Sequence, residues 1–336
     1  MNMKKYLLLF AMVLIALASC DDNKNKVPRL GKAQSAPFEL LLVTNKEWLN
    51  TQAGQALKVV LNSPIVGLPQ QEPHFRLTTI NHNAFDGVFR FYANVLVVKV
   101  GADCKEPKVS VQKEAYCQNQ LLIKMEAPDD ASFVTMLREK AEIILDYFDE
   151  QEVMREYGLL KKNYSGKVMA QAQKQFGVSI KAPVDIDDIK SGENFFWASA
   201  SKQEFRTNVC MYSLPVRNMT LDDFVAARDS VMMINIPGDR EGQWMETDSR
   251  TVSYKSRTMR ESGQNVIEVR GLWDMRNDAM GGPFVSYVMT DDVNNRLIVA
   301  EGFIFAPKEE KRAMIRQLEA TLQTVILTQN SDNTQK

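Results

Sequence analysis

Short apolar runs and amphipathic segments alternate along the first half of the chain. The run at 38–43 lies between Pro37 and Asn45 and predicts a buried strand. Asn45 can cap a helix whose apolar positions continue to residue 61, and Pro64 ends it. Further strands are predicted at 76–80, 88–100, 109–111 and 121–126, followed by helices at 129–148 and 150–176.

The second half of the chain shows a comparable alternation. Strands are predicted at 194–200, 208–214, 251–259, 265–275, 284–290 and 297–305, with helices at 221–233 and after Ala306-Pro307. The polar segment 291–295 separates the last two strands and is typical of a hairpin turn. Such hairpin-linked strands favour an antiparallel sheet.

The two halves share one order of elements. Ala127-Pro128 and Ala306-Pro307 each precede a helix and lie 179 residues apart, and Gly67 and Gly238 lie 171 residues apart in turns that follow a helix. These offsets suggest an internal duplication, although an α+β chain can offer such coincidences. The predicted fold is α+β, with antiparallel sheets, helices packed on one face, and two similar halves.

The N-terminus carries the pattern of an exported lipoprotein. Two lysines precede the apolar run of KKYLLLFAMVLIALASC, which is too short for a stable transmembrane helix and ends in Leu17-Ala18-Ser19-Cys20. Small residues before a cysteine indicate that Cys20 becomes the mature N-terminus and carries acyl chains such as palmitate. The alternative is a plain signal peptide that happens to be followed by a cysteine.

These patterns divide the chain into five segments. They are a lipoprotein signal peptide (1–19), a lipidated tether (20–36), a first α+β half (37–150), a second α+β half (151–328) and a polar tail (329–336). The expected location is the cell envelope, with the lipid in a membrane and the protein facing the periplasm or the cell surface.

Composition narrows the possible partners. Hydrophobic residues make up 45% of the chain, which is enough for a sizeable core. Removal of residues 1–19 takes the 41 basic residues to 39 against 42 acidic ones, a formal net charge of about −3. A nucleic-acid-binding protein would carry a basic excess, so we expect no nucleic acid partner. The expected partners are the membrane and an unidentified envelope protein or glycan.

Cysteine and histidine are scarce. Apart from Cys20, the cysteines are Cys104, Cys117 and Cys210, and the histidines are His74 and His82. Cys104 and Cys117 could form a disulfide across the segment between them, or all three could be buried thiols. Since no cysteine neighbours a histidine in the sequence, we expect neither a metal site nor a cofactor.

Candidate chemistry is sparse as well. The chain lacks a glycine-rich phosphate loop and a Gly-x-Ser-x-Gly elbow, so no catalytic residue is assigned. One enzymatic alternative remains, a glycoside-hydrolase-like pair formed by Glu72 and Glu241, which lie in corresponding turns. A non-catalytic binding or scaffolding module is the preferred interpretation.

The two proline-containing turns supply a candidate binding surface. Each follows a predicted helix and carries polar side chains that a role in the core does not explain. Ordinary capped turns would look the same. The proposed surface comprises Gln70, Gln71, Glu72, His74, Asp239, Arg240, Glu241, Trp244 and Trp273.

Several less common strings point to a family. They are LPQ at 68–70, EP at 72–73, RDS at 228–230, NIPG at 235–238, GLW at 271–273, MGGPF at 280–284 and EGF at 301–303. Together with the lipoprotein signal they resemble a family of Bacteroidota lipoproteins known as domain of unknown function 4837. The resemblance extends over residues 38–327 and implies location and family, but no activity.

Overall fold

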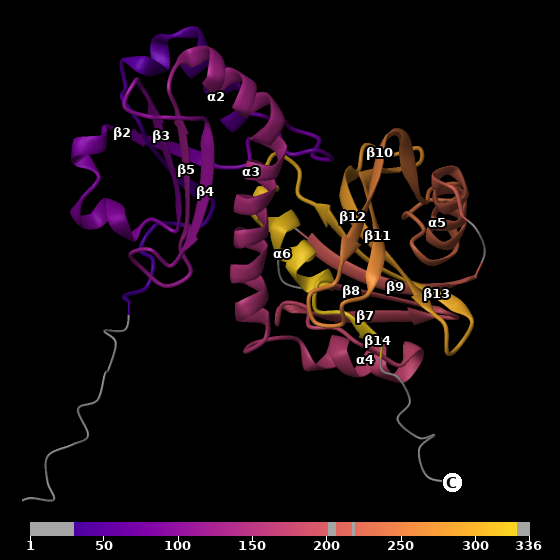
Figure 1. Cartoon of the computed structure of the whole chain (residues 1–336). Helices are drawn as coiled ribbons and strands as arrows, with labels where there is room; N and C mark the ends of the chain where they lie inside the picture. Colours follow the sequence, from indigo (N-terminus) through magenta and orange to yellow (C-terminus); the bar gives the residue numbers. More distant parts are fainter. Residues whose placement is uncertain (1–29, 201–205, 217–218, 328–336) are drawn as a thin grey trace, which may run out of the picture.

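The protein consists of two halves, each built around one β-sheet (Figure 1). The computed structural model describes residues 30–200, 206–216 and 219–327, and within these ranges the strands form a five-stranded, a seven-stranded and a two-stranded sheet. The first half contains β1 (Glu39–Val43), η1 (Trp48–Asn50), α2 (Gln52–Leu61), β2 (Arg76–Ile80), η2 (His82–Ala84), η3 (Gly87–Phe91), β3 (Asn94–Val100), β4 (Lys108–Lys113), β5 (Leu121–Ala127) and α3 (Asp130–Leu160). The second contains α4 (Gly166–Phe176), β6 (Val178–Ser179), β7 (Ile186–Gly192), β8 (Phe195–Ala200), β9 (Arg206–Pro215), α5 (Leu221–Asn235), β10 (Met245–Thr258), β11 (Asn265–Met275), β12 (Gly281–Asp291), β13 (Arg296–Phe305), α6 (Arg312–Leu322) and β14 (Ile326–Leu327).

The first sheet is mixed rather than antiparallel. Its order is β2-β1-β3-β5-β4, in which β2, β1, β3 and β5 are parallel and β4 alone is antiparallel to its neighbour. The continuous apolar run of β1 explains its central place, because a parallel strand is covered on both faces and carries apolar residues at successive positions. The prediction of antiparallel pairing therefore holds in this half for β4 and β5 only.

Different elements cover the two faces of the first sheet. Helices α2 and α3 pack on one face, around Phe75, Phe133 and Phe148. Aromatic side chains from the η2–η3 region, among them Phe85 and Phe89, close the other face. The strand predicted at 88–100 is thus shorter than expected, since its first residues form the 3-10 helix η3 and β3 begins at Asn94.

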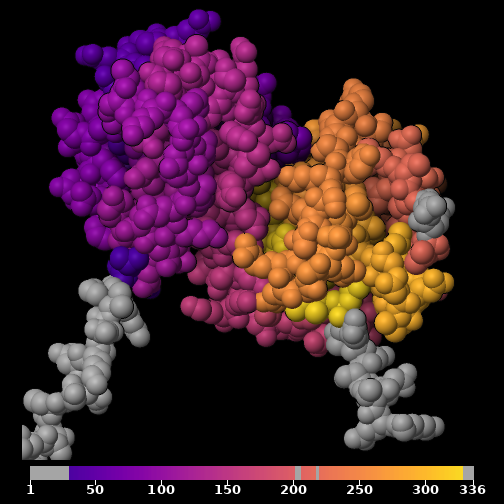
Figure 2. Space-filling view, in the orientation of Figure 1, coloured from indigo at the N-terminus to yellow at the C-terminus, as the bar shows by residue number. Residues whose placement is uncertain are grey.

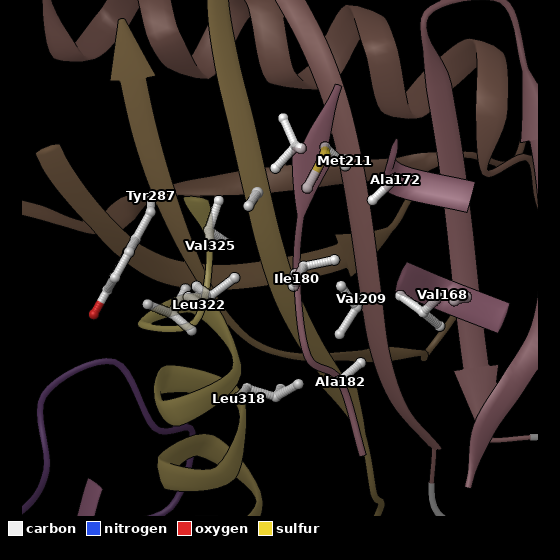
Figure 3. Close-up of a cluster of buried hydrophobic side chains, with 14 of the residues drawn as sticks. Val168, Ala172, Ile180, Ala182, Val209, Met211, Tyr287, Leu318, Leu322 and Val325 are labelled. Carbon is white, nitrogen blue, oxygen red and sulfur yellow. The ribbon is translucent and has the colours of Figure 1, made fainter. Parts of the chain in front are cut away.

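The second sheet confirms the predicted antiparallel pairing. Its order is β10-β11-β12-β13-β9-β8-β7, and every neighbouring pair runs antiparallel. Helix α6 packs directly on β13. The approach is so close that a Cβ atom at Gly302 would lie only 2.8 Å from the Cβ of Leu318. Figure 3 shows Leu318 and Leu322 of α6 in one cluster with Val209 and Met211 of β9.

Helices cover both faces of the second sheet, which differs from the prediction of a single covered face. Helices α4 and α6 lie on one face, whereas α5 packs on the other, around Phe224 and Met232. A buried ion pair joins α5 to the sheet: Arg228 donates to Glu301 at 2.7 Å, and Ser286 donates to the same carboxylate at 2.7 Å. The Arg228 guanidinium also lies 4.1 Å from the centre of the Phe284 ring.

The two halves are not structural repeats. The first strand of the first sheet, β1, pairs with parallel neighbours, whereas every strand of the second sheet, such as β9 between β8 and β13, pairs with antiparallel ones. The shared order of elements therefore does not extend to a shared topology. The class α+β and the division into two halves are confirmed, while the duplication is not supported.

Helix α3 links the halves. Its first part packs on the first sheet through Phe133, Leu137 and Phe148, and its last part packs against Ala320 of α6 through Val153 and Tyr157. With 31 residues it spans about 46 Å. The boundary expected at residue 150 consequently lies inside this helix.

The turn before β2 fixes the start of α6. Both carboxylate oxygens of Glu72 accept hydrogen bonds from the backbone N–H of Lys311, and Oε2 accepts a third from Arg312, at 2.8–3.0 Å. The N-cap residue Lys311 makes no capping bond with its own side chain. An acidic side chain from the first half thus satisfies the exposed N–H groups and the positive end of a helix in the second.

A chain of buried ion pairs continues this contact, and we call it the interlobe ion network. Asp149 of α3 accepts from His74 at 2.7 Å and pairs with Arg316 of α6 at 2.6 Å. Arg316 and Arg270 of β11 share Glu319 of α6, and Glu268 lies between Arg270 and Arg257 of β10. Burial alone would raise the pKa of Glu319, but Arg270 and Arg316 hold it far below its ordinary value.

Replacing Glu319 by glutamine is predicted to lower the free energy of unfolding by about 3 kcal/mol at neutral pH, because two buried arginines lose their counter-charge. Since the folded-state pKa is lowered, this contribution is complete above the ordinary carboxyl pKa of 4.5 and is lost as the pH falls below it. The gap between wild type and variant should narrow there by about 1.4 kcal/mol per pH unit. Urea unfolding of the wild type and the variant at several pH values measures this difference in the free energy of unfolding.

Glu310→Gln is the matched control for that prediction. Glu310 pairs with Arg76 at 2.8 Å, but both side chains are more than half exposed. Loss of such a pair should change the free energy of unfolding by at most about 1 kcal/mol. Equal effects of the two substitutions would contradict a stabilising role for the interlobe ion network.

Glu72→Gln is predicted to destabilise the start of α6 by about 1–2 kcal/mol, because the N–H groups of the first turn lose a charged acceptor. Hydrogen exchange at Lys311 and Arg312 should accelerate. The same substitution at the exposed Glu241 should leave both stability and exchange unchanged. Slow exchange retained in Glu72→Gln would show that this carboxylate does not cap the helix.

Candidate functional site

A cleft of about 1140 Å³ lies between the two halves. Figure 2 shows these halves as two lobes in contact, with the orange surface of the second half beside the magenta and indigo surface of the first. One wall comes from α3 and residues 63–66, and the other from residues 253–258 of β10. The interlobe ion network contributes His74, Asp149, Arg270 and Arg316 to the lining.

Exposed apolar side chains from both halves meet at this cleft. They are between 47% and 74% exposed and comprise Val59, Val66, Ile143, Tyr147 and Tyr254. Exposed residues of this size that gather at one place mark interaction surfaces more often than isolated ones do. The cleft is therefore the strongest candidate for a binding site in the described part of the chain.

The charges along the cleft occur in pairs of opposite sign. Glu150 of α3 lies 3.5 Å from Arg257 and 3.2 Å from Arg260, and Asp146 lies 4.0 Å from Lys255. These pairs connect the two walls, and the groups of the interlobe ion network neutralise one another beneath them. Such an arrangement does not favour a strongly charged ligand.

The chemistry of the cleft suits binding. His74 Nδ1 donates to the Asp149 carboxylate, and it lies 3.5 Å from Arg316. Among the residues that the structure describes, no group of three or more His, Cys, Asp or Glu side chains could hold a metal ion. The oxygen Oδ1 of Asp149 is buried and has no hydrogen-bond partner among the described residues.

The surface expected from the two proline-containing turns does not form. Glu72 and His74 are committed to contacts between the halves, and Gln70 accepts from Lys311 Nζ at 2.8 Å, while Gln71 stays exposed. The second turn follows α5 on the opposite face of the second sheet from α6, and none of its residues lines the cleft. Only the first turn reaches the cleft.

The second turn keeps its own contacts. Asp239, Arg240 and Glu241 are exposed, and Trp244 lies under the Arg276 guanidinium at 4.7 Å. Trp273 is 2% exposed and donates to the carbonyl of Ile304, so it is a core residue. The carboxylates of Glu72 and Glu241 consequently belong to different faces and do not form the pair that a glycoside hydrolase would need.

The cleft residues missed from the sequence left a weak signal in α3. Ile143 and Tyr147 each precede a core residue, Ile144 and Phe148, so this helix carries apolar side chains on a second face. An apolar stripe wider than one core face indicates a second contact surface. The remaining wall residues come from distant segments, and their meeting could not be predicted.

The described cysteines are separate thiols. Cys104 lies 3.8 Å from the carbonyl of Lys99, and Cys117 lies 4.0 Å from that of Tyr92. Tyr92 lies two residues before β3 and Lys99 near its end, so the two carbonyls are roughly 20 Å apart and the disulfide considered for Cys104 and Cys117 cannot form without rearrangement. Cys210 is also free, and burial raises the pKa of its thiol. Cys20 lies outside the described residues.

No helix in the described ranges is long and apolar enough to span a membrane. This finding concerns residues 30–200, 206–216 and 219–327, and the expected signal peptide precedes them.

Comparisons with known proteins return low similarity to solved structures. A structure of a mutant of the protein Mog1 has 13% identity and a TM-score of 0.30, and covers 46% of this chain and 92% of its own. The Ran-binding protein Mog1p of Saccharomyces cerevisiae has 12% identity and a TM-score of 0.31, with the same coverage. These values are too low to indicate a shared function. No curated protein matches the chain.

Two protein families match the chain in succession. Residues 33–161 match the family described as "Domain of unknown function (DUF8532)". Residues 165–324 match "Domain of unknown function (DUF4837)", so the resemblance expected over 38–327 holds for the second half. The change occurs where α3 ends and α4 begins. The chain therefore joins two segments that each match a family of unknown function, DUF8532 in the first half and DUF4837 in the second.

Proposed function

We propose that this protein is a lipid-anchored binding module of the cell envelope of a Bacteroidota bacterium, without catalytic activity. Its partner would be an envelope protein or glycan that enters the cleft between the halves. The observation that carries the binding role is the cleft itself, which gathers five exposed apolar side chains from both halves around paired charges.

The anchor rests on the N-terminal sequence. The apolar run that ends in Leu17-Ala18-Ser19-Cys20 is typical of a signal peptide whose cysteine is acylated. Residues 20–29 then separate the lipid from Leu30, where the described chain begins, and ten residues reach at most about 35 Å. The folded halves would remain close to the membrane and face the periplasm or the cell surface.

The positions of Glu72 and Glu241 do not favour the alternative of a glycoside-hydrolase-like enzyme. Glu72, one member of the proposed carboxylate pair, accepts three backbone hydrogen bonds at the start of α6 and is buried. Glu241, the other member, is exposed beyond α5. A general acid or base needs access to substrate, which Glu72 does not have.

Cys20→Ala is predicted to prevent acylation and to release the mature protein from the membrane fraction, because acyl chains contribute about 0.8 kcal/mol per buried CH₂. Membrane fractionation and intact mass of the mature N-terminus measure this. Cys104→Ala, which alters a buried thiol, should remain acylated and membrane-bound. A wild-type protein without acyl mass on Cys20 would contradict the proposed anchor.

A further inference from the structure

We propose that the cleft receives an extended polypeptide segment, which adds to the free edge of β10 as a further strand of the second sheet. This inference rests on the proposed binding function and specifies its partner. The segment belongs to another protein and is predominantly uncharged, with apolar side chains at alternate positions.

The free edge of β10 faces the cleft. β10 is the terminal strand of the second sheet, and residues 253–258 pair on one side with residues 265–270 of β11. Successive side chains of a strand point to opposite faces of the sheet. Since all six residues 253–258 line the cleft, the cleft runs along the edge of this strand, and it continues over the face of β11 that carries Glu268 and Arg270.

An unpaired strand edge offers a row of backbone donors and acceptors to an incoming chain. Peptides bind such edges by adding a strand, with main-chain hydrogen bonds supplying affinity and pockets for alternate side chains supplying specificity. Six residues of β10 correspond to a segment about 20 Å long.

The walls of the cleft fit apolar side chains. Val66 precedes the turn at Gly67, and Ile143 and Tyr147 lie one helical turn apart on α3, so they face the cleft together. Tyr254 supplies an aromatic surface on β10 itself. A segment of alternating apolar residues could bury these side chains, which are now in water.

Charge argues against anionic ligands. The lining contains six acidic and four basic side chains, so the cleft has no positive excess to attract a phosphate or a nucleic acid. A glycan or a second copy of this chain remains as an outcome to be tested.

The test uses the full chain and a random 12-residue peptide library displayed on phage. Enriched peptides should protect amides of residues 253–258 from hydrogen exchange. Methylation of single backbone nitrogens of such a peptide should weaken its binding at least tenfold at every second residue and have little effect at the residues between. This alternation distinguishes strand addition from contacts made by side chains alone.

Variants of the cleft complete the test. Val66→Asp and Tyr254→Asp should each weaken the selected peptide at least tenfold. Val293→Asp is the matched control, because Val66 and Val293 are both 66% exposed and Val293 lies in the β12–β13 turn. Unfolding midpoints of all three variants should stay close to that of the wild type, since each side chain is exposed.

Three outcomes would overturn the proposal. The first is that no enriched peptide protects β10. The second is that N-methylation weakens binding equally at every position or at none. The third is that the chain binds a glycan array, or dimerises through β10, in a manner abolished by Val66→Asp. A glycan result would leave the binding function intact and replace its partner, whereas acylation of Cys20 is tested separately.

Discussion

The position of the two halves depends on buried charges that cannot be left without partners. Asp149, Arg316, Glu319 and Arg270 form one continuous series across three elements, from α3 through α6 to β11. Separating the halves would break the pair between Asp149 and Arg316, and a buried charge that loses its partner costs several kcal/mol. All of these charges have partners in one relative position of the two halves, so the contact fixes that position.

The cleft is a consequence of this contact between the halves. The interlobe ion network and the Glu72 cap hold the turn before β2 against α6, and this brings α3 opposite the edge of β10. Neither half contains the cleft alone, although each matches a different family. A binding site at the boundary of two domains is common, because that boundary provides concave surfaces without weakening either core.

The sequence predicted local structure better than long-range contacts. The apolar patterns at 76–80 and 265–275 correspond to β2 and β11 to the residue. By contrast, the run in β1 could not reveal strand direction, since a buried strand looks alike in parallel and antiparallel sheets. The sequence predicts Glu72 and Trp273 as surface residues, but both are buried, because their partners, the start of α6 and the carbonyl of Ile304, lie far along the chain. Several strings that carried the resemblance, including those with Arg228, Phe284 and Glu301, meet in the core.

The claim that a fixed contact between the halves shapes the cleft can be tested by measuring the distance between them. Spin labels at Val111→Cys on β4 and Val293→Cys in the β12–β13 turn report this distance by pulsed electron resonance, since both positions are exposed and the described native thiols are buried. The account predicts a single narrow distance population, which broadens when Asp149→Asn is added, because Asp149 of α3 pairs with Arg316 of α6 across the contact. A broad population in the protein with an intact interlobe ion network would contradict it.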